Sequence, residues 1–332
     1  MTAAEESAVH RIAFLDRGVF KVAFRRPSFA HEWIEYPHTS AEEVGERVRD
    51  VTIAITDGVP ITAETIAGAP DLQLIAVAAT GFNGIDLDAC RERGITVCNI
   101  RDWSISVPEH VFALILALRR QLATYSGAVR AGAWQQSPAY ALVLEPIPRT
   151  LTGSTLGLIG HGAVGKNVAR IARGFGMDII IAERQGVAPR EGRVALDDVI
   201  ARSDVLVVMC PLTEETRGLI GSQDLARMKP NAIVINCARG GIVDEAALVD
   251  ALERGVIAGA GIDVVSEEPP ARGNVLLDAS LPNLIVTPHV AWVSAESQSI
   301  LAAQLIDNLE AFVAGTPRNV VFSPTQADGE GR

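Results

Sequence analysis

Short runs of aliphatic and β-branched residues alternate with helical patterns along most of the chain. Each run is apolar at successive positions, and polar residues, glycine or proline bound it. Strands that are apolar on both faces are typical of parallel sheets covered by helices on both sides. The predicted strands form two sets, 12–15, 52–56, 72–79 and 95–99, and then 155–160, 178–182, 204–210, 232–237, 259–263 and 284–287.

A long helical pattern, roughly residues 106–131, separates the two sets of strands. Ser106 can cap its N-terminus, and Pro108 lies near its first turn, where a missing N–H costs little. A second helical pattern, "SQSILAAQLIDNLEAFVAG", follows residue 293 and ends at Gly315. The tail "SPTQADGEGR" is polar, which predicts disorder. These patterns predict an α/β protein.

The length of 332 residues exceeds what one hydrophobic core usually supports, so we expect two domains. Hydrophobic residues make up 48% of the chain, enough for two large cores. The formal net charge of -11 argues against nucleic acid or an anionic membrane surface as the main partner. It leaves room for a small anionic substrate, which needs only one or two well-placed cations.

No segment predicts export, membrane insertion or a metal site. The N-terminus carries early acidic residues, and the apolar run at 111–118 is too short to span a bilayer. Cys90, Cys98, Cys210 and Cys237 show no CxxC spacing, which favours free thiols in a reducing cytoplasm. The histidines form no HxH or HxxxH pair, so we expect no bound metal.

Gly160, Gly162 and Gly165 form a GxGxxG loop between a predicted strand and a helix. The first glycine permits a tight turn, the second lets a pyrophosphate approach, and the third lets helix and strand pack closely. The stretch also matches most of a phosphate loop, but Asn167 stands where Mg²⁺ binding needs a hydroxyl. Glu183, 18 residues after Gly165 at the end of the next strand, favours a dinucleotide.

Glu183 also bears on the choice of cofactor. A carboxylate at this position accepts hydrogen bonds from the ribose hydroxyls and repels a 2'-phosphate, which predicts NAD. Arg184 follows directly and either serves a 2'-phosphate, if the loop turns, or is a solvated cation. NADP therefore remains possible.

Three side chains of complementary chemistry, Arg239, Glu268 and His289, each follow a predicted strand of the second set. In an open parallel sheet the carboxyl ends of the strands meet at one edge, where ligands bind. A guanidinium can bind a carboxylate, an imidazole can donate a proton to a carbonyl, and a glutamate raises the imidazole pKa. The trio predicts hydride transfer involving a small 2-oxo or 2-hydroxy acid. Each residue alone has a structural alternative, as a capping cation, a solvated acid or a histidine packed near Trp292.

Longer motifs surround these residues: "GLIGHGAVG", "CPLTEETRGLI", "MKPNAIVINCARGGIVDEAAL", "GAGIDVVSEEPP" and "TPHVAW". With them the chain resembles the D-isomer-specific 2-hydroxyacid dehydrogenase family along nearly its whole length. The resemblance implies that Arg239 binds the substrate, that His289 is the acid/base and that Glu268 pairs with it. It also implies substrate contacts at Thr80, Gly81, Phe82 and Trp292. The cofactor contacts that it implies are Val107, Gly160, Gly162, Ala163, Val164, Gly165, Glu183, Arg184, Cys210, Pro211, Thr216, Cys237, Ala238, Asp263 and His289.

The resemblance also implies two doubly wound parallel-sheet domains. A flavodoxin-like substrate domain would comprise 1–104 and 293–332, and a Rossmann NAD-binding domain, 105–292, would be inserted into it. A homodimer would form largely through 106–150, with Trp103 and Trp134 in segments that suit the contact or pack within the chain.

Within the family, "RDWSISVPEHVFALILALRR" and "IAERQG" are most similar to bacterial glycerate dehydrogenases, also called hydroxypyruvate reductases. Asp57 and Gly58 stand where that subgroup tends to carry an Asn-Lys pair, which leaves the preferred 2-oxo acid open. Hydroxypyruvate, glyoxylate, pyruvate and bulkier acids are all candidates. A different class, the dinucleotide-sensing corepressors that share this fold, is the alternative, and turnover of a 2-oxo acid would separate the two.

Overall fold

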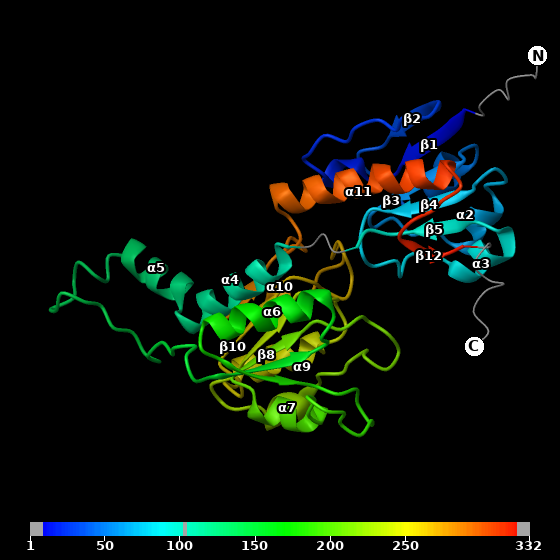
Figure 1. The fold of residues 1–332 in the computed structure, drawn as a ribbon. Helices are drawn as coiled ribbons and strands as arrows, with labels where there is room; N and C mark the ends of the chain where they lie inside the picture. The colour runs from blue at the N-terminus through cyan, green and yellow to red at the C-terminus, as the bar shows by residue number, and fades with distance from the viewer. Residues whose placement is uncertain (1–8, 102–104, 324–332) are drawn as a thin grey trace, which may run out of the picture. The chain divides into compact units, whose positions relative to one another are not determined.

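The computed structural model describes residues 9–101 and 105–323, in which each of two compact units holds a six-stranded sheet. One unit combines the portions of the chain within 1–104 and 293–332, and the other spans Ile105–Trp292. Figure 1 shows the blue N-terminal portion and the orange-to-red C-terminal portion within the same unit. The chain therefore leaves the first unit, forms the second, and returns to the first.

The first unit is built on a largely parallel sheet of order β12-β5-β4-β3-β1-β2. Its strands are β1 (His10–Phe14), β2 (His31–Glu35), β3 (Ile53–Thr56), β4 (Leu74–Val77), β5 (Thr96–Cys98) and β12 (Val320–Phe322). Only the antiparallel pairing of β12 with β5 departs from the parallel pattern among the described residues. The edge strands β2 and β12 were not predicted from the sequence.

Helices cover both faces of this sheet. A core of buried residues joins one face to α1 (Val44–Val48), α2 (Ala63–Ala67) and α3 (Leu87–Arg93). The predicted C-terminal helix is present as α11 (Ala295–Val313), which packs against β4 and contributes Leu301 and Leu305 to the buried interior (Figure 1). A single 3₁₀ turn, η1 (Arg17–Val19), follows β1.

The second unit is built on an all-parallel sheet of order β11-β10-β9-β8-β6-β7. Its strands are β6 (Thr155–Ile159), β7 (Asp178–Ile181), β8 (Val205–Val208), β9 (Ile233–Asn236), β10 (Gly259–Ile262) and β11 (Leu284–Val286), each within one residue or two of a predicted strand. The order reverses at β6, since β7 lies on one side and β8 on the other. Ligands of open α/β sheets bind at such a switch point, beyond the carboxyl ends of the strands.

Different helices cover the two faces of this second sheet. The core on one face includes α4 (Val107–Arg119) and α6 (Ala163–Gly174). The core on the other includes α7 (Leu196–Arg202), α8 (Ser222–Arg227), α9 (Glu245–Glu253) and α10 (Val275–Asp278). Both sheets are thus doubly covered, as the continuously apolar strands predict.

The prediction of one helix over 106–131 is wrong. The chain forms α4 and a separate α5 (Leu122–Arg130), because Gln121 between them adopts a left-handed conformation with φ of 52°. Ser106 occupies the N-cap position of α4, but among the described residues its side chain makes no capping hydrogen bond there. Trp103 and the polar tail from residue 324 lie outside the described residues.

The described residues include no helix with the length and hydropathy that crossing a bilayer requires.

Cys90, Cys98, Cys210 and Cys237 are free thiols. Burial raises the pKa of the Cys210 thiol to about 11 and also raises that of Cys237. Both thiols therefore stay protonated near neutral pH.

Candidate active site

The carboxyl ends of the strands in the second unit gather most of the predicted site residues. Gly160 follows β6, Glu183 follows β7, Cys210 and Pro211 follow β8, Arg239 follows β9, Asp263 and Glu268 follow β10, and His289 follows β11. Because β9, β10 and β11 are adjacent, the loops carrying Arg239, Glu268 and His289 are neighbours.

The glycine loop leaves room for a ligand at one of its three glycines. A Cβ on Gly160 would lie 2.4 Å from the carbonyl oxygen of Met209, and one on Gly165 would lie 2.4 Å from that of Gly160. A Cβ on Gly162 would meet no heavy atom of the described residues within 4 Å, apart from its own chain neighbours. Gly162 is also the N-cap of α6, whose first N–H groups receive no side-chain cap in the described part of the chain. An open cradle of N–H groups at a helix N-terminus fits a dinucleotide pyrophosphate.

Glu183 lies at the end of β7 with its side chain only 1% exposed. Its carboxylate accepts hydrogen bonds from Nε and Nη2 of Arg190 at 2.6 and 2.9 Å and from the backbone N–H of Arg184 at 3.0 Å. The Arg190 hydrogen bond, followed by the Arg184 N–H, lowers the pKa of Glu183 to about 2. No sequence pattern predicts the role of Arg190, which stands seven positions further along an irregular loop.

His289 and Glu268 are hydrogen-bonded to each other. The imidazole Nδ1 lies 2.7 Å from Oε2 of Glu268, and Oε1 of Glu268 accepts the backbone N–H of Val265 at 2.9 Å. Both side chains are partly exposed, at 39% for His289 and 33% for Glu268. The pair is therefore held in place yet open to a ligand.

The pair shifts both pKa values toward the charged forms. The hydrogen bond to Glu268 raises the pKa of His289 above 6.5, and its effect exceeds the opposing effect of burial. Burial is the largest single influence on Glu268 and favours its neutral form. The hydrogen bond and charge of His289, the Val265 N–H and the charge of Arg239 together outweigh it and lower the pKa below 4.5. Each partner therefore favours the charged form of the other, imidazolium beside carboxylate.

The backbone at His289 has a φ of 54°, which is rare for a residue with a side chain. Buried Asp263 holds the surrounding loop. Its Oδ1 accepts from the Thr287 hydroxyl at 2.5 Å and the Val290 N–H at 2.9 Å, and its Oδ2 accepts from the Ala291 N–H at 2.8 Å. His110 of α4 extends the network, with Nε2 3.0 Å from the Thr287 hydroxyl. Asp263 therefore orients the His289 loop, and neither His110 nor Thr287 was predicted.

The turn that carries Arg239 is fixed from two sides. The Asn236 side chain donates to the Arg239 carbonyl at 2.9 Å and accepts the Ala238 N–H at 3.1 Å. Gly240 lies so close to the next loop that a Cβ would stand 1.9 Å from the Val265 carbonyl oxygen. This close approach brings the Arg239 turn against the loop that carries Glu268. The Arg239 charge accordingly affects the pKa values of both Glu268 and His289.

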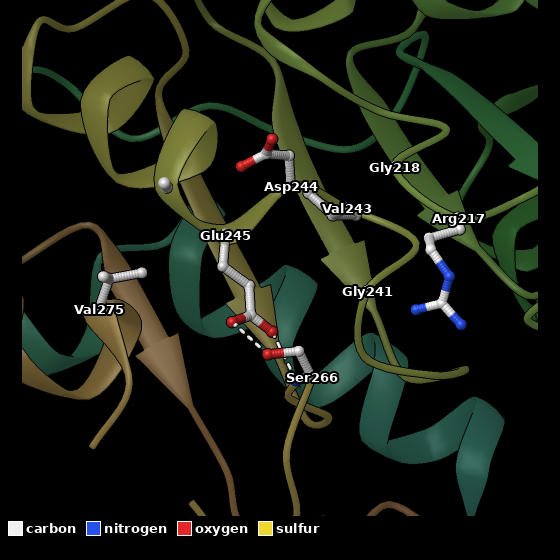
Figure 2. Close-up of a pocket in the computed structure, with 9 residues that line it drawn as sticks. Arg217, Gly218, Gly241, Val243, Asp244, Glu245, Ser266 and Val275 are labelled. Carbon is white, nitrogen blue, oxygen red and sulfur yellow. Dashed lines mark hydrogen bonds between the residues drawn. The ribbon is translucent and has the colours of Figure 1, made fainter. Parts of the chain in front are cut away.

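A pocket of about 350 Å³ lies beside this turn. Figure 2 shows the Glu245 carboxylate, at the start of α9, pointing at Ser266. It accepts the Ser266 N–H at 2.6 Å and hydroxyl at 3.0 Å, and the Asn274 side chain at 2.7 Å. None of the predicted site residues lines this pocket. The Glu245 carboxylate therefore anchors the loop that leads to Glu268.

The remaining predicted residues lie in several places. Val107 is buried at the start of α4, and Trp292 packs against the core of the same face. Thr216 donates to the carbonyl of Pro211 at 2.7 Å, which closes the loop after β8. Thr80, Gly81 and Phe82 follow β4 in the first unit, where the Thr80 hydroxyl donates to the Ile100 carbonyl at 3.1 Å. The described residues contain no cluster of His, Cys, Asp and Glu suited to a metal ion.

Comparison with known proteins adds to this geometry. A sequence profile described as "D-isomer specific 2-hydroxyacid dehydrogenase, NAD binding domain" matches residues 112–291. The glycerate dehydrogenase of Methylorubrum extorquens is 49% identical over 313 residues, covering 94% of this chain and 98% of that protein. The hydroxypyruvate reductase of Blautia hydrogenotrophica is 36% identical over 298 residues, covering 87% of this chain and 92% of that protein.

Among solved structures, the NADPH-dependent glyoxylate/hydroxypyruvate reductase of Sinorhizobium meliloti, in complex with NADP and malonate, is similar to this chain with a TM-score of 0.80. It is 31% identical, and the match covers 96% of this chain and 98% of that one. The D-lactate dehydrogenase of Aquifex aeolicus, complexed with NAD and lactic acid, matches with a TM-score of 0.78 and 28% identity, over 92% of this chain and 96% of that one.

Proposed function

This chain belongs to the D-isomer specific 2-hydroxyacid dehydrogenase family, and we propose that it reduces hydroxypyruvate and glyoxylate with His289 as the proton donor. It is an NAD(P)-dependent enzyme that transfers a hydride between the cofactor and a 2-oxo acid. The observation that carries the residue assignment is the 2.7 Å hydrogen bond between His289 and Glu268 beyond the ends of adjacent strands.

His289 acts as general acid in the reductive direction. Its raised pKa extends to higher pH the range in which the imidazole is protonated and holds a proton to give to the carbonyl oxygen of the substrate. The nicotinamide cofactor, when bound, supplies the hydride. In the oxidative direction neutral His289 takes the hydroxyl proton back. Glu268 stabilises the imidazolium through Nδ1, which leaves Nε2 as the nitrogen that faces the substrate.

Arg239 binds the substrate. A guanidinium presents paired N–H donors that match a carboxylate or an adjacent carbonyl. The Asn236 hydrogen bonds and the close contact at Gly240 support its position next to the His289–Glu268 pair. Thr80, Gly81, Phe82 and Trp292 remain predicted substrate contacts, and Val107, Ala163, Val164, Cys210, Pro211, Thr216, Cys237 and Ala238 remain predicted cofactor contacts.

The substrate proposal rests on the relatives, since proteins named glycerate dehydrogenase, hydroxypyruvate reductase and glyoxylate reductase all match this chain. A panel of hydroxypyruvate, glyoxylate, pyruvate and bulkier 2-oxo acids, assayed with NADH and NADPH, tests it. We expect the highest kcat/KM with hydroxypyruvate or glyoxylate. A preference for pyruvate or a bulkier acid would refute the substrate assignment. NADH binding with no turnover of any acid would favour the dinucleotide sensor.

A cytoplasmic homodimer is the assembly that we propose. The four free thiols suit a reducing compartment. The segment from α5 to residue 147 exposes large apolar side chains, which a partner subunit would cover. These are Leu122, Val129, Trp134, Tyr140, Val143 and Ile147.

A further inference from the structure

Glu183, the acidic residue at the end of β7, forms a bidentate ion pair with Arg190. Glu183 is buried, whereas the Arg190 side chain that binds both its oxygens is 66% exposed. Nε and Nη2 of Arg190 bind the carboxylate, and Nη1 has no partner among the described residues. The guanidinium therefore has one edge fixed by Glu183 and the other edge available to a ligand.

This pairing changes what the strand end offers to a dinucleotide. An acid at this position accepts hydrogen bonds from ribose hydroxyls and repels a 2'-phosphate when its oxygens face the ligand. Here the oxygens of Glu183 face Arg190 and the Arg184 N–H. The negative charge is balanced by a bidentate guanidinium, and the exposed group is the cation.

A second arginine strengthens the positive field at this place. Arg193 donates to the Ala182 carbonyl at 2.9 Å and lies 3.9 Å from the Glu183 carboxylate, so it is fixed at the end of β7. Burial and then the charges of Arg193, Lys166 and Arg173 lower the pKa of His161 in the glycine loop. Arg193 thus acts on both the strand end and the glycine loop.

We propose that Arg190 makes the adenosine end of this site accept a 2'-phosphate, so that the enzyme binds NADPH about as tightly as NADH. A phosphate monoester carries more than one negative charge at neutral pH, and a guanidinium binds its oxygens with paired N–H groups. Glu183 acts as the residue that positions Arg190. This inference rests on the dinucleotide site of the proposed function and reverses the preference for NAD that Glu183 alone predicts.

The test measures binding without turnover. Isothermal titration of the apoenzyme with NADH, NADPH, 5'-AMP and 2',5'-ADP gives the dissociation constants of matched ligands that differ in the 2'-phosphate. For the wild type we expect NADH and NADPH constants within about tenfold of each other, and tighter binding of 2',5'-ADP than of 5'-AMP. For Arg190→Ala we expect NADPH and 2',5'-ADP to bind at least about tenfold more weakly, with NADH changed by less than about threefold.

Arg190→Lys is the second variant, for the case in which Arg190→Ala fails to fold. A lysine keeps a positive charge beside buried Glu183. A single ammonium cannot bind Glu183 and a phosphate as a fork does, so we expect NADPH binding to weaken by at least about threefold and NADH binding to stay unchanged. Arg254→Ala is the matched control, since Arg254 is an exposed arginine paired with Asp250 on α9. It should leave both constants unchanged.

Two results would overturn the inference while leaving the proposed function intact. One is wild-type NADH binding more than about 100-fold tighter than NADPH binding, the discrimination expected of an acid facing the ribose. The other is an equal loss of NADH and NADPH affinity in Arg190→Ala. Binding of neither dinucleotide would instead refute the assignment of the site itself.

Discussion

The imidazole Nδ1 of His289 lies 2.7 Å from the carboxylate Oε2 of Glu268, although the two residues are 21 positions apart in the chain. Each follows a different strand, and each is held by further hydrogen bonds. Asp263 holds the backbone of the His289 loop, and the Val265 N–H holds the second oxygen of Glu268. The pair is therefore held in position by the protein's own hydrogen bonds.

Replacing Glu268 with glutamine should shift the pH dependence of reduction. Activity requires protonated His289, so kcat/KM should fall as the pH rises through the His289 pKa, which lies above 6.5 in the wild type. Because the Glu268 hydrogen bond raises that pKa, Glu268→Gln should move this alkaline limb to lower pH. In the oxidative direction neutral His289 is the base, so kcat/KM should rise as the pH rises through the same pKa. Glu268→Gln should move this acidic limb to lower pH as well. Rate profiles in both directions measure the shift, and an unmoved limb would contradict the pairing.

His289→Ala should lose most of the chemistry and little of the nucleotide binding. Loss of a positioned acid typically costs about 10²- to 10⁴-fold in rate. We expect kcat to fall by that range while the NADH dissociation constant, from fluorescence titration, changes by less than about threefold. Retained turnover would refute the role of His289.

Arg239→Ala should weaken substrate binding and turnover. Hydrogen bonds to charged groups contribute about 1.5–3 kcal/mol, which corresponds to roughly 10- to 100-fold in kcat/KM. Arg239→Lys keeps the charge and loses the fork, so it should recover only part of this loss. Steady-state kinetics of both variants provide the comparison, and equal activity of the alanine variant and the wild type would exclude Arg239 from the site.

Gly240→Ala should displace the Arg239 turn. A Cβ there would stand 1.9 Å from the Val265 carbonyl oxygen, so the two loops must separate. Overpacking of this kind costs about 1–3 kcal/mol, and we expect a lower denaturation midpoint together with reduced kcat/KM. Gly174→Ala in α6 is the control, because no heavy atom of the described residues outside its own helix turn and chain neighbours lies within 4 Å of the added Cβ. A Gly240→Ala protein with wild-type kinetics would show that the contact does not position Arg239.

Asp263→Ala should destabilise the second unit and disorder the His289 loop. It leaves the N–H groups of Val290 and Ala291 without their acceptor. An unsatisfied buried group costs about 1–3 kcal/mol, so we expect the free energy of unfolding to fall by at least that amount. Exposed Asp197→Ala in α7 should change it by less than about 0.5 kcal/mol. Urea titrations of the two variants give the comparison, and equal stabilities would contradict the structural role of Asp263.

Most of the fold follows from the apolar pattern. Strands such as β8 and β9 are short and apolar at successive positions because both faces of each sheet are covered, and their short length separates them from helices. The pattern of β2 includes Glu32 and Glu35, as suits an edge strand, and gave no such signal. The break between α4 and α5 was missed because the helical spacing of apolar residues continues across Gln121. The sequence does not predict the left-handed backbone of Gln121.

The candidate site also has a part that the sequence predicts and a part that it does not. The convergence of Arg239, Glu268 and His289 is predictable because parallel strands end at one edge. The partners of Glu183 and Asp263 are not predictable, since they depend on how loops return to the sheet. Arg190 reaches Glu183 only because the loop folds back, with the Glu183 N–H bound to the Val194 carbonyl at 2.8 Å. Local patterns do not encode such contacts.

The first unit takes its elements from both ends of the chain, and this has a consequence for biosynthesis. Residues 105–292 leave the ribosome before α11 and β12, so the second unit can fold while the first still lacks the helix that packs on β4 and the strand that pairs with β5. During that interval apolar residues on β4 and the edge of β5 stay open to other nascent chains. A translation product that stops before α11 would therefore aggregate through the unit whose other elements were synthesised first.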